Sequence, residues 1–161
     1  MRRSKNSACS IHYRVMKSRF QLTPAVYMIF RKESKVLLLR RFDTGWRDGE
    51  YTLPSGHLDG NETARAAAAR ESKEEVGVDV DPNNLKFVHV VHRRGDDGDH
   101  ERVDFFFEVL KYSGQLKNAE PNKCDDFSWF DLQALPDNTV PGVKQVLAKI
   151  DQNESYSELN F

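Results

Sequence analysis

A run of good helix formers at residues 63–76 (TARAAAARESKEEV) most constrains how this chain can fold. It contains no Gly or Pro, and Gly77 follows at the place where a glycine commonly ends a helix. The segments on either side are short β-rich runs separated by polar turns. The chain must therefore pack this helix against a sheet, which predicts an α/β-type domain.

Five β-rich runs predict strands, at residues 25–30, 35–40, 85–92, 103–112 and 127–130. The first two are separated by a short polar connection, which predicts a hairpin. Residues 42–60 are rich in Gly, Asp and Pro and predict a loop. Apolar residues recur at a helical period over residues 140–151. This order predicts a mixed sheet between helices.

Three glutamates gather near the end of the predicted helix, at positions 71, 74 and 75. At about 100° per residue, Glu75 lies about 40° from Glu71, and Glu74 lies about 60° to its other side. All three carboxylates therefore share one face. Ala66, Ala69 and Val76 fall on the opposite side as a small-residue stripe for a sheet, and Ala67 and Ala68 leave space beside the acids.

Such an acidic face is either an ordinary solvated surface or a binding site for a cation. Like charges at i,i+4 destabilise a helix, and the C-terminal half is the unfavourable end for acids. A site for a hard divalent cation needs these carboxylate oxygens. The Pro- and Gly-containing stretch at residues 51–60 (YTLPSGHLDG), just before the helix, lets backbone groups approach a ligand closely.

Residues 56–78 read GHLDGNETARAAAARESKEEVGV, which resembles the Nudix box, GX5EX7REUXEEXGU with U aliphatic, of the Nudix hydrolases. The matching positions are Gly56, Glu62, Arg70, Glu71, Glu74, Glu75, Gly77 and Val78. Ser72 departs from the pattern, because an aliphatic residue is usual there. The resemblance implies a Nudix-type α/β/α sandwich over roughly residues 20–151.

The same resemblance implies hydrolysis of a diphosphate linkage with Mg²⁺ or Mn²⁺. Glu71 and Glu75 would be metal ligands, with Glu74 a direct or water-mediated ligand. The backbone carbonyl of Ser55 or Gly56 would complete the inner shell. Arg70 would orient the carboxylates and would pair with Glu62.

Which glutamate of the box acts as general base, if any, varies within the family. The base can also come from a later loop, where the candidates are Asp97, Asp99, Glu120, Asp125 and Asp126. Glu120 is favoured because its loop precedes a strand that returns toward the site, with an ordinary surface acid as the alternative. Arg40, Arg41 and Lys123 are candidates for phosphate contacts, although each is equally explained as a solvated charge. Trp129 and Phe130 are candidates for stacking on a base, with burial in the core as the alternative.

The chain most resembles the MutT-type branch, which implies conversion of a (deoxy)nucleoside triphosphate to a monophosphate and pyrophosphate. The alternatives are ADP-ribose, a nucleotide sugar, a dinucleotide polyphosphate or a capped RNA end as substrate. A non-catalytic nucleotide-binding domain is a further alternative. A homodimer is compatible with the sequence.

Charge and cysteine content bound the remaining classes. Residues 1–20 carry six Lys/Arg and no acid, whereas residues 21–161 carry 18 Lys/Arg against 25 Asp/Glu. An acidic body argues against a stable nucleic-acid partner. Residues 1–19 are expected to be a poorly ordered basic arm or a transit peptide, and residues 152–161 a weakly ordered tail.

The two cysteines, Cys9 and Cys124, fit neither a zinc site nor a disulfide framework and indicate a reducing, cytoplasmic setting. No apolar run reaches the roughly 18 residues of a membrane-spanning helix.

Overall fold

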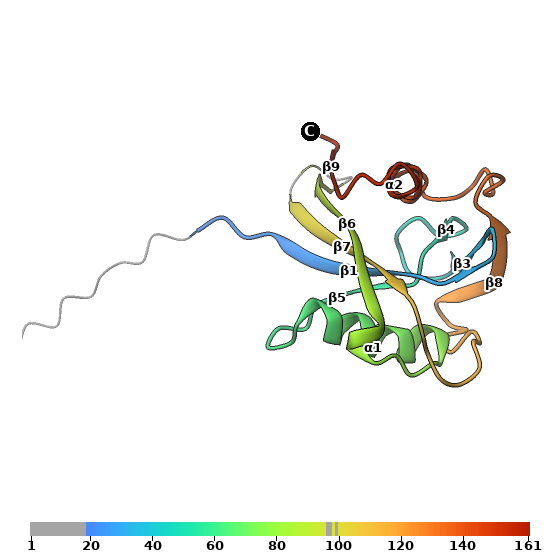
Figure 1. Ribbon diagram of the computed structural model, residues 1–161. Helices are drawn as coiled ribbons and strands as arrows, with labels where there is room; N and C mark the ends of the chain where they lie inside the picture. The colour runs from blue at the N-terminus through green and yellow to red at the C-terminus, as the bar shows by residue number, and fades with distance from the viewer. Residues whose placement is uncertain (1–18, 96–97, 99) are drawn as a thin grey trace, which may run out of the picture.

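A five-stranded sheet lies between two helices in the computed structural model, which describes residues 19–95, 98 and 100–161 (Figure 1). Its strand order is β5 (Ser55–His57), β1 (Thr23–Ile29), β7 (Glu101–Val109), β6 (Leu85–Arg94) and β9 (Tyr156–Leu159). β1 is parallel to β7 and β6 to β9, and the other neighbours are antiparallel. The predicted α/β fold with a mixed sheet between helices is confirmed.

A second sheet comprises β2 (Arg31–Lys32), β3 (Lys35–Arg41) and β4 (Tyr51–Thr52), with β8 (Cys124–Asp131) paired to β3. The predicted hairpin is therefore wrong, because β1 and β3 belong to different sheets and only β2 pairs with β3. Residues 25–30 and 36–39 are continuously buried. Continuously buried strands are covered on both faces, whereas the strands of a simple hairpin expose one face to solvent.

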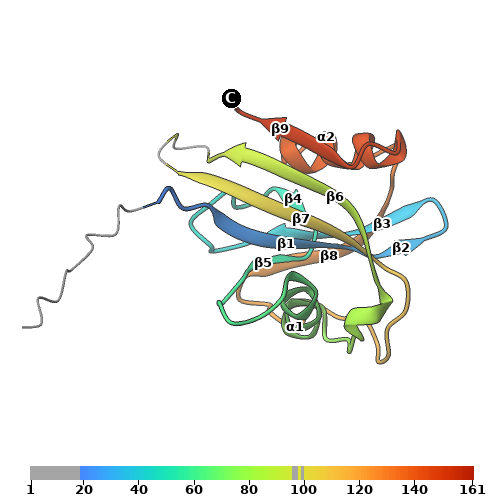
Figure 2. The same ribbon diagram turned by 60° about the vertical axis from the view of Figure 1, so that its left-hand side comes forward.

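The helix α1 (Ala64–Val76) covers one face of the five-stranded sheet (Figure 2). The Thr63 side chain accepts a hydrogen bond from the backbone N–H of Ala66 and caps its start, and Gly77 ends it at a φ of 74°. Ala67 and Ala68 are fully buried, together with Val76, in the hydrophobic core beneath the sheet. The expectation that these two alanines leave open space beside the acids is wrong.

Ser72, the departure from the family pattern, is also fully buried in this layer. Its hydroxyl donates a 2.7 Å hydrogen bond to the carbonyl oxygen of Ala68, one turn earlier in the helix. A buried hydroxyl is tolerated when it has such a partner. The departure therefore leaves the packing of α1 intact.

The other face of the sheet is covered by α2 (Pro141–Asp151), which buries Val143, Val146 and Leu147 (Figure 1). A single 3₁₀ turn, η1 (Pro82–Asn84), leads into β6. Two short strands, β4 and β5, lie within the stretch predicted to be loop. Over the described ranges, no helix is both long and apolar enough to cross a membrane.

The C-terminal tail is not weakly ordered, because β9 adds to the edge of the sheet beside β6. The fully buried His89 fixes this segment. Its ring nitrogens lie 2.8 Å from the carbonyl oxygen of Glu154 and 2.7 Å from the hydroxyl of Ser157. The mostly polar residues 152–161 gave no local indication of a strand, since the pairing partner lies more than 60 positions away.

Candidate functional site

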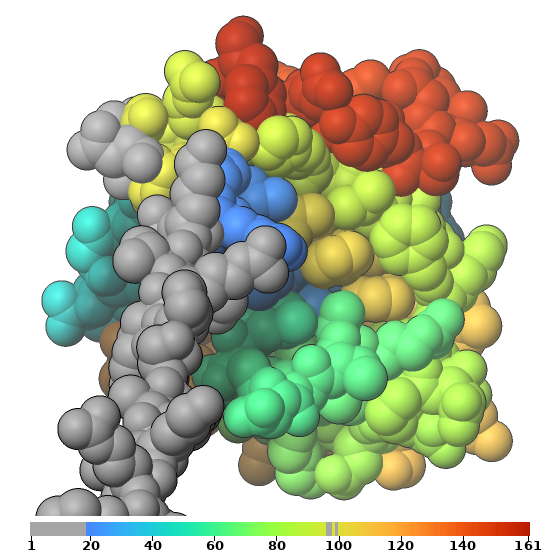
Figure 3. All heavy atoms as spheres, turned by 90° about the vertical axis from the view of Figure 1, so that its left-hand side faces the viewer, coloured from blue at the N-terminus to red at the C-terminus, as the bar shows by residue number. Residues whose placement is uncertain are grey.

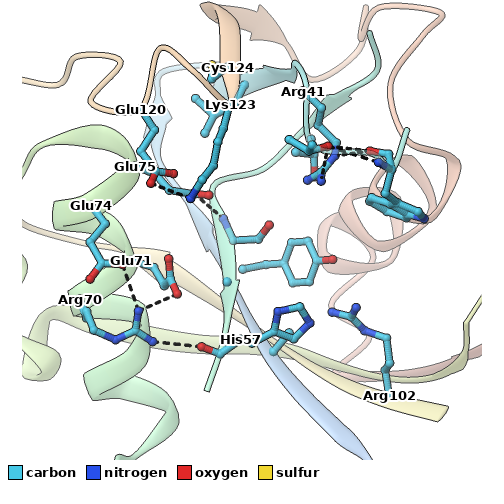
Figure 4. A pocket seen from close by; sticks show the side chains of 18 of the residues that line it. Arg41, His57, Arg70, Glu71, Glu74, Glu75, Arg102, Glu120, Lys123 and Cys124 are labelled. Carbon is cyan, nitrogen blue, oxygen red and sulfur yellow. Dashed lines mark hydrogen bonds and ion pairs between the residues drawn. The ribbon is translucent and has the colours of Figure 1, made fainter. Parts of the chain in front are cut away.

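A cleft of about 750 Å³ straddles the edge strand β5. The face of the molecule where β1 (blue), the ends of β6 and β7 (yellow) and the β5–α1 segment (green) lie next to one another is shown in Figure 3. Figure 4 shows the carboxylates of α1 on one side of β5 and Arg41, His57 and Arg102 on the other. We refer to these as the acidic side and the basic side of the cleft.

The acidic side is built by α1, whose glutamates face β5. The Glu75 carboxylate accepts a 2.7 Å hydrogen bond from the backbone N–H of Ser55. The side chain of Glu71 is 13% exposed and that of Glu74 is 50% exposed. The three glutamates therefore lie on one face of the helix, as the helical spacing predicts, and their side chains range from buried to half-exposed.

Arg70 is the centre of this side. Its guanidinium lies 2.7 Å from Glu71, 3.1 Å from Glu74 and 2.9 Å from Glu62. It also donates a 3.0 Å hydrogen bond to the carbonyl oxygen of His57, on β5. The expected pair of Glu62 and Arg70 is present, and Arg70 ties the helix to the strand.

Gly56 lies against the carboxylate of Glu71. A Cβ added at Gly56 would lie 2.0 Å from the carboxyl carbon of Glu71, which no real contact permits. The glycine is therefore required for the approach of the helix carboxylate to the strand, rather than for an unusual backbone angle.

Glu120 reaches the acidic side from the loop that precedes β8. The loop is fastened to the end of α1, because the backbone N–H of Ala119 donates to the carbonyl oxygen of Glu75 at 3.0 Å. Glu120 lines the cleft and forms a 2.8 Å ion pair with Lys123, which also lines it. Of the later-loop candidates for the base that the structure describes, Glu120 alone lines the cleft.

Crowding and burial change the acidity of these groups. Burial raises the pKa of Glu75 to about 8, and the negative charges of Glu71 and Glu120 add to the shift. Burial also raises the pKa of Glu71, while the Arg70 guanidinium opposes the shift. The metal-free protein therefore keeps acids here that bind protons more tightly than free glutamate.

The donor set fits a hard divalent cation. Carboxylate and backbone oxygens are the ligands that Mg²⁺ and Mn²⁺ prefer, and a cation would relieve the crowding that raises these pKa values. As the described side chains stand, no group of three or more acidic, His or Cys residues is gathered closely enough to hold a metal ion. Arg70 contacts one oxygen of Glu71 and one of Glu74, and the Ser55 amide contacts one oxygen of Glu75.

On the basic side, Arg41 ends β3, and Trp46 lies in the loop between β3 and β4. The Asp48 carboxylate shapes this loop by accepting hydrogen bonds from the backbone N–H groups of Thr44 and Gly45 at 3.0 Å. Arg41 donates to the carbonyl oxygen of Trp46 at 2.7 Å, and its guanidinium lies 4.8 Å from the indole ring centre. Both side chains line the cleft.

The sheet supplies the rest of the basic side. Tyr27 from β1, His57 from β5, Arg93 from β6 and Arg102 from β7 all line the cleft. Burial, together with the positive charge of Arg102, lowers the pKa of His57. A neutral imidazole leaves the positive charge of this side to its arginines.

Three predicted substrate contacts do not line the cleft. Arg40 forms a 2.7 Å ion pair with Asp125 on the second sheet. Trp129 packs on the core beneath α1, and Phe130 packs on the core beneath α2. The aromatic pair alternates between the two faces of β8 and belongs to the core, which was the open alternative.

The remaining base candidates separate in the same way. Asp125 is held by Arg40, and Asp126 accepts hydrogen bonds from Tyr51 and Ser128. Neither lines the cleft. Asp97 and Asp99 lie outside the described residues.

Five further residues line the cleft although the sequence did not predict them, namely Tyr27, Trp46, His57, Arg93 and Arg102. Of these, only Trp46 could have been suspected from its local sequence, because it is a large aromatic residue in a Gly- and Asp-rich loop of the kind that positions binding groups. The others lie on strands, and only the register of the sheet brings them together.

The fold and this cleft define an α/β domain with a mixed sheet between two helices and a cluster of helix carboxylates beside an edge strand. A family model described as NUDIX domain matches residues 20–150. The chain therefore belongs to the Nudix family, and it is a pyrophosphohydrolase that acts on nucleotide derivatives.

Similar proteins agree with this assignment. The ADP-ribose pyrophosphatase of Methanocaldococcus jannaschii is 34% identical over 74% of this chain and 69% of its own length. The uncharacterized Nudix hydrolase YvcI of Bacillus subtilis is 31% identical over 74% of this chain and 73% of its own length. The crystal structure of the MutT NUDIX hydrolase from Burkholderia pseudomallei superposes with a TM-score of 0.72 at 23% identity, covering 80% of this chain and 97% of that one.

Proposed function

We propose that this chain hydrolyses a (deoxy)nucleoside triphosphate to the monophosphate and pyrophosphate, with Mg²⁺ as cofactor and Mn²⁺ as a substitute. The observation that carries this proposal is the division of one cleft into an acidic side and a basic side. The acidic side suits a cation that holds a diphosphate. The basic side, with Arg41, suits the further charge of a longer phosphate chain.

Glu71, Glu74 and Glu75 would hold the cation, together with the backbone oxygen of Ser55 or Gly56. When bound, such a cation neutralises phosphate charge and lowers the pKa of an attached water. Arg70 is a positioning residue, since it fixes three glutamates and the strand that faces them.

The remaining roles fall to groups on the rim. Glu120 is the proposed general base, because it lies beside the glutamates from a separate loop and can take a proton from the attacking water. Lys123 holds the Glu120 carboxylate at 2.8 Å and offers a positive charge to the phosphates. Water adds to one phosphorus as the bridging P–O bond breaks, and the leaving phosphate takes the electron pair.

A second candidate substrate is ADP-ribose. It is favoured by the name of the Methanocaldococcus jannaschii relative, to which this chain is 34% identical. ADP-ribose carries only the scissile diphosphate, so it would use the acidic side and leave the arginines of the basic side without an anion to bind.

A product assay decides between the two. Purified full-length protein with Mg²⁺ is incubated with nucleoside triphosphates, ADP-ribose, nucleotide sugars and dinucleotide polyphosphates, and the products are separated by anion exchange. The proposal expects a triphosphate to be the best substrate and to yield monophosphate plus pyrophosphate. Release of inorganic phosphate from the triphosphate, or faster turnover of ADP-ribose, would contradict it.

A further inference from the structure

Two arginines face each other across the strand pair at the basic side. Arg93 on β6 and Arg102 on β7 are direct partners in the antiparallel register. Like charges directly opposite one another destabilise a sheet. A nearby anion offsets this cost.

One buried carboxylate supplies part of that compensation. Asp104, two residues after Arg102 on the same face of β7, is 2% exposed. It lies 2.5 Å from Arg93 and 3.4 Å from Arg102. This one carboxylate therefore contacts both guanidinium groups.

The two arginines are not held equally. Arg93 makes a short contact with Asp104, whereas both hydrogen bonds from Arg102 to Asp104 are 3.4 Å long. The side chain of Arg102 is 16% exposed and lines the cleft. Arg102 thus directs a loosely engaged guanidinium into the cavity, and Figure 4 shows it across β5 from the glutamates.

We propose that Arg102, backed by Arg93, is a second phosphate site, which takes a phosphate group beyond the diphosphate held at the glutamates. A guanidinium fork matches phosphate oxygens, and Arg102 lines the cleft with only long contacts to Asp104. The inference rests on the proposed function in one respect, namely that hydrolysis occurs at the acidic side. The substrate class is then a nucleoside diphosphate derivative that carries at least one additional phosphate.

That phosphate has two chemical sources. It is either the end of a longer phosphate chain, or a monoester on a sugar attached to the diphosphate. Two probe sets distinguish them. The first is the series of di-, tri- and tetraphosphates of the nucleoside that the product assay selects, and the second is ADP-ribose beside ADP-ribose 2′-phosphate.

The test compares wild type with Arg102→Gln, which removes the charge and keeps a polar side chain. Arg102→Lys keeps the charge and removes the fork. Arg40→Gln is the matched control, because Arg40 pairs with an aspartate on a strand but lies outside the cleft. Thermal unfolding of all four proteins reports whether each variant is folded.

We expect the wild type to prefer, within each set, the substrate that carries the additional phosphate. This preference should arise from a lower KM for that substrate. Arg102→Gln should lower kcat/KM for that member by about 10- to 100-fold, the range expected for a hydrogen bond to a charged group. The same variant should change kcat/KM for the member that lacks the additional phosphate by less than about threefold. Arg102→Lys should fall between the two, and Arg40→Gln should match wild type.

Two results would overturn the inference. One is that the wild type shows no preference for the additional phosphate in either set. The other is that Arg102→Gln lowers kcat/KM equally for every substrate, which would mean that the arginines serve only to neutralise Asp104. If wild type hydrolyses nothing, the proposed function fails on its own. Calorimetry with tripolyphosphate in EDTA then decides, because equal binding, or no binding, by wild type and Arg102→Gln refutes the site.

Discussion

The two sides of the cleft are assembled in different ways. The acidic side takes most of its charged groups from one stretch, residues 55–75, and adds Glu120 and Lys123 from a distant loop. The basic side draws single residues from five strands and from the loop between β3 and β4. The proposed function therefore places chemistry in a local motif and recognition on residues spread over the sheets.

This division gives a testable rule. Changes on the acidic side should lower kcat, because they act on the reacting centre, and changes on the basic side should raise KM. The two sides meet at β5, where His57 presents its carbonyl oxygen to Arg70 and its side chain to the basic side.

The largest expected effect is that of Glu75→Gln. Loss of one carboxylate from the proposed metal site, beside the proposed base, should lower kcat by roughly 10²- to 10⁴-fold. The amide can still accept the hydrogen bond from Ser55, so circular dichroism should be unchanged. Steady-state kinetics, with Glu158→Gln on β9 as a remote control, measure the effect. Full activity in Glu75→Gln would remove the acidic side from the mechanism.

Gly56→Ala should give the next largest effect. The new Cβ would overlap the Glu71 carboxyl group, which is the movable end of a side chain. The fold should therefore survive while the carboxylate is displaced, and a misplacement of about 1 Å costs about 10²-fold in kcat.

Gly142→Ala is the matched control for this prediction. The Cβ added at that position on α2 meets only Leu159 at 3.7 Å, an ordinary contact. Kinetics and thermal unfolding of both variants separate the effects. Equal activities would show that close approach of Glu71 to β5 is dispensable.

The pH dependence of the free energy of unfolding reports how much the buried Glu75 carboxylate of the acidic side destabilises the fold when it is ionised. In the folded metal-free protein the pKa of Glu75 is about 8, against 4.5 for an ordinary glutamate. The folded state then binds more protons than the unfolded state between these values. The free energy of unfolding should therefore fall as pH rises from about 4.5 to 8, by about 4 kcal/mol.

Urea unfolding in EDTA, at pH 5 and pH 8.5, measures this fall. Glu75→Gln has no proton to lose, so its fall should be smaller than that of wild type, and added Mg²⁺ should restore wild-type stability at the higher pH. An equal fall in both proteins would assign the pH dependence to other groups.

The contrast between the two sides also explains what the sequence could reveal. Helical spacing alone placed Glu71, Glu74 and Glu75 on one face, because the period of a helix is fixed and local. The α/β class followed from alternating β-rich and helical runs. The burial of Ala67 and Ala68 was not predicted, because a helix that is rich in small residues shows little difference in hydrophobicity between its faces.

Residues placed by strand register could not be predicted in this way. Arg93 and Arg102 become neighbours only when β6 and β7 pair, and His89 gains its partners only when the tail returns to the edge of the sheet. For Trp129 and Phe130 the sequence leaves stacking on a base and burial in the core both open, and alternation along β8 turns the two side chains into the core on opposite faces.

Trp46→Ala tests the basic side with the smallest expected effect. The indole ring is 37% exposed and lies against the Arg41 guanidinium at 4.8 Å, so its loss frees Arg41 from a cation–π contact. KM should rise by roughly 3- to 10-fold with kcat nearly unchanged, since about 1 kcal/mol of positioning is removed. Phe42→Ala, an exposed aromatic residue of the same connection that does not line the cleft, should leave both constants unaltered. A fall in kcat in Trp46→Ala with KM constant would mean that the basic side also acts at the reacting centre, and the division between chemistry and recognition would have to be abandoned.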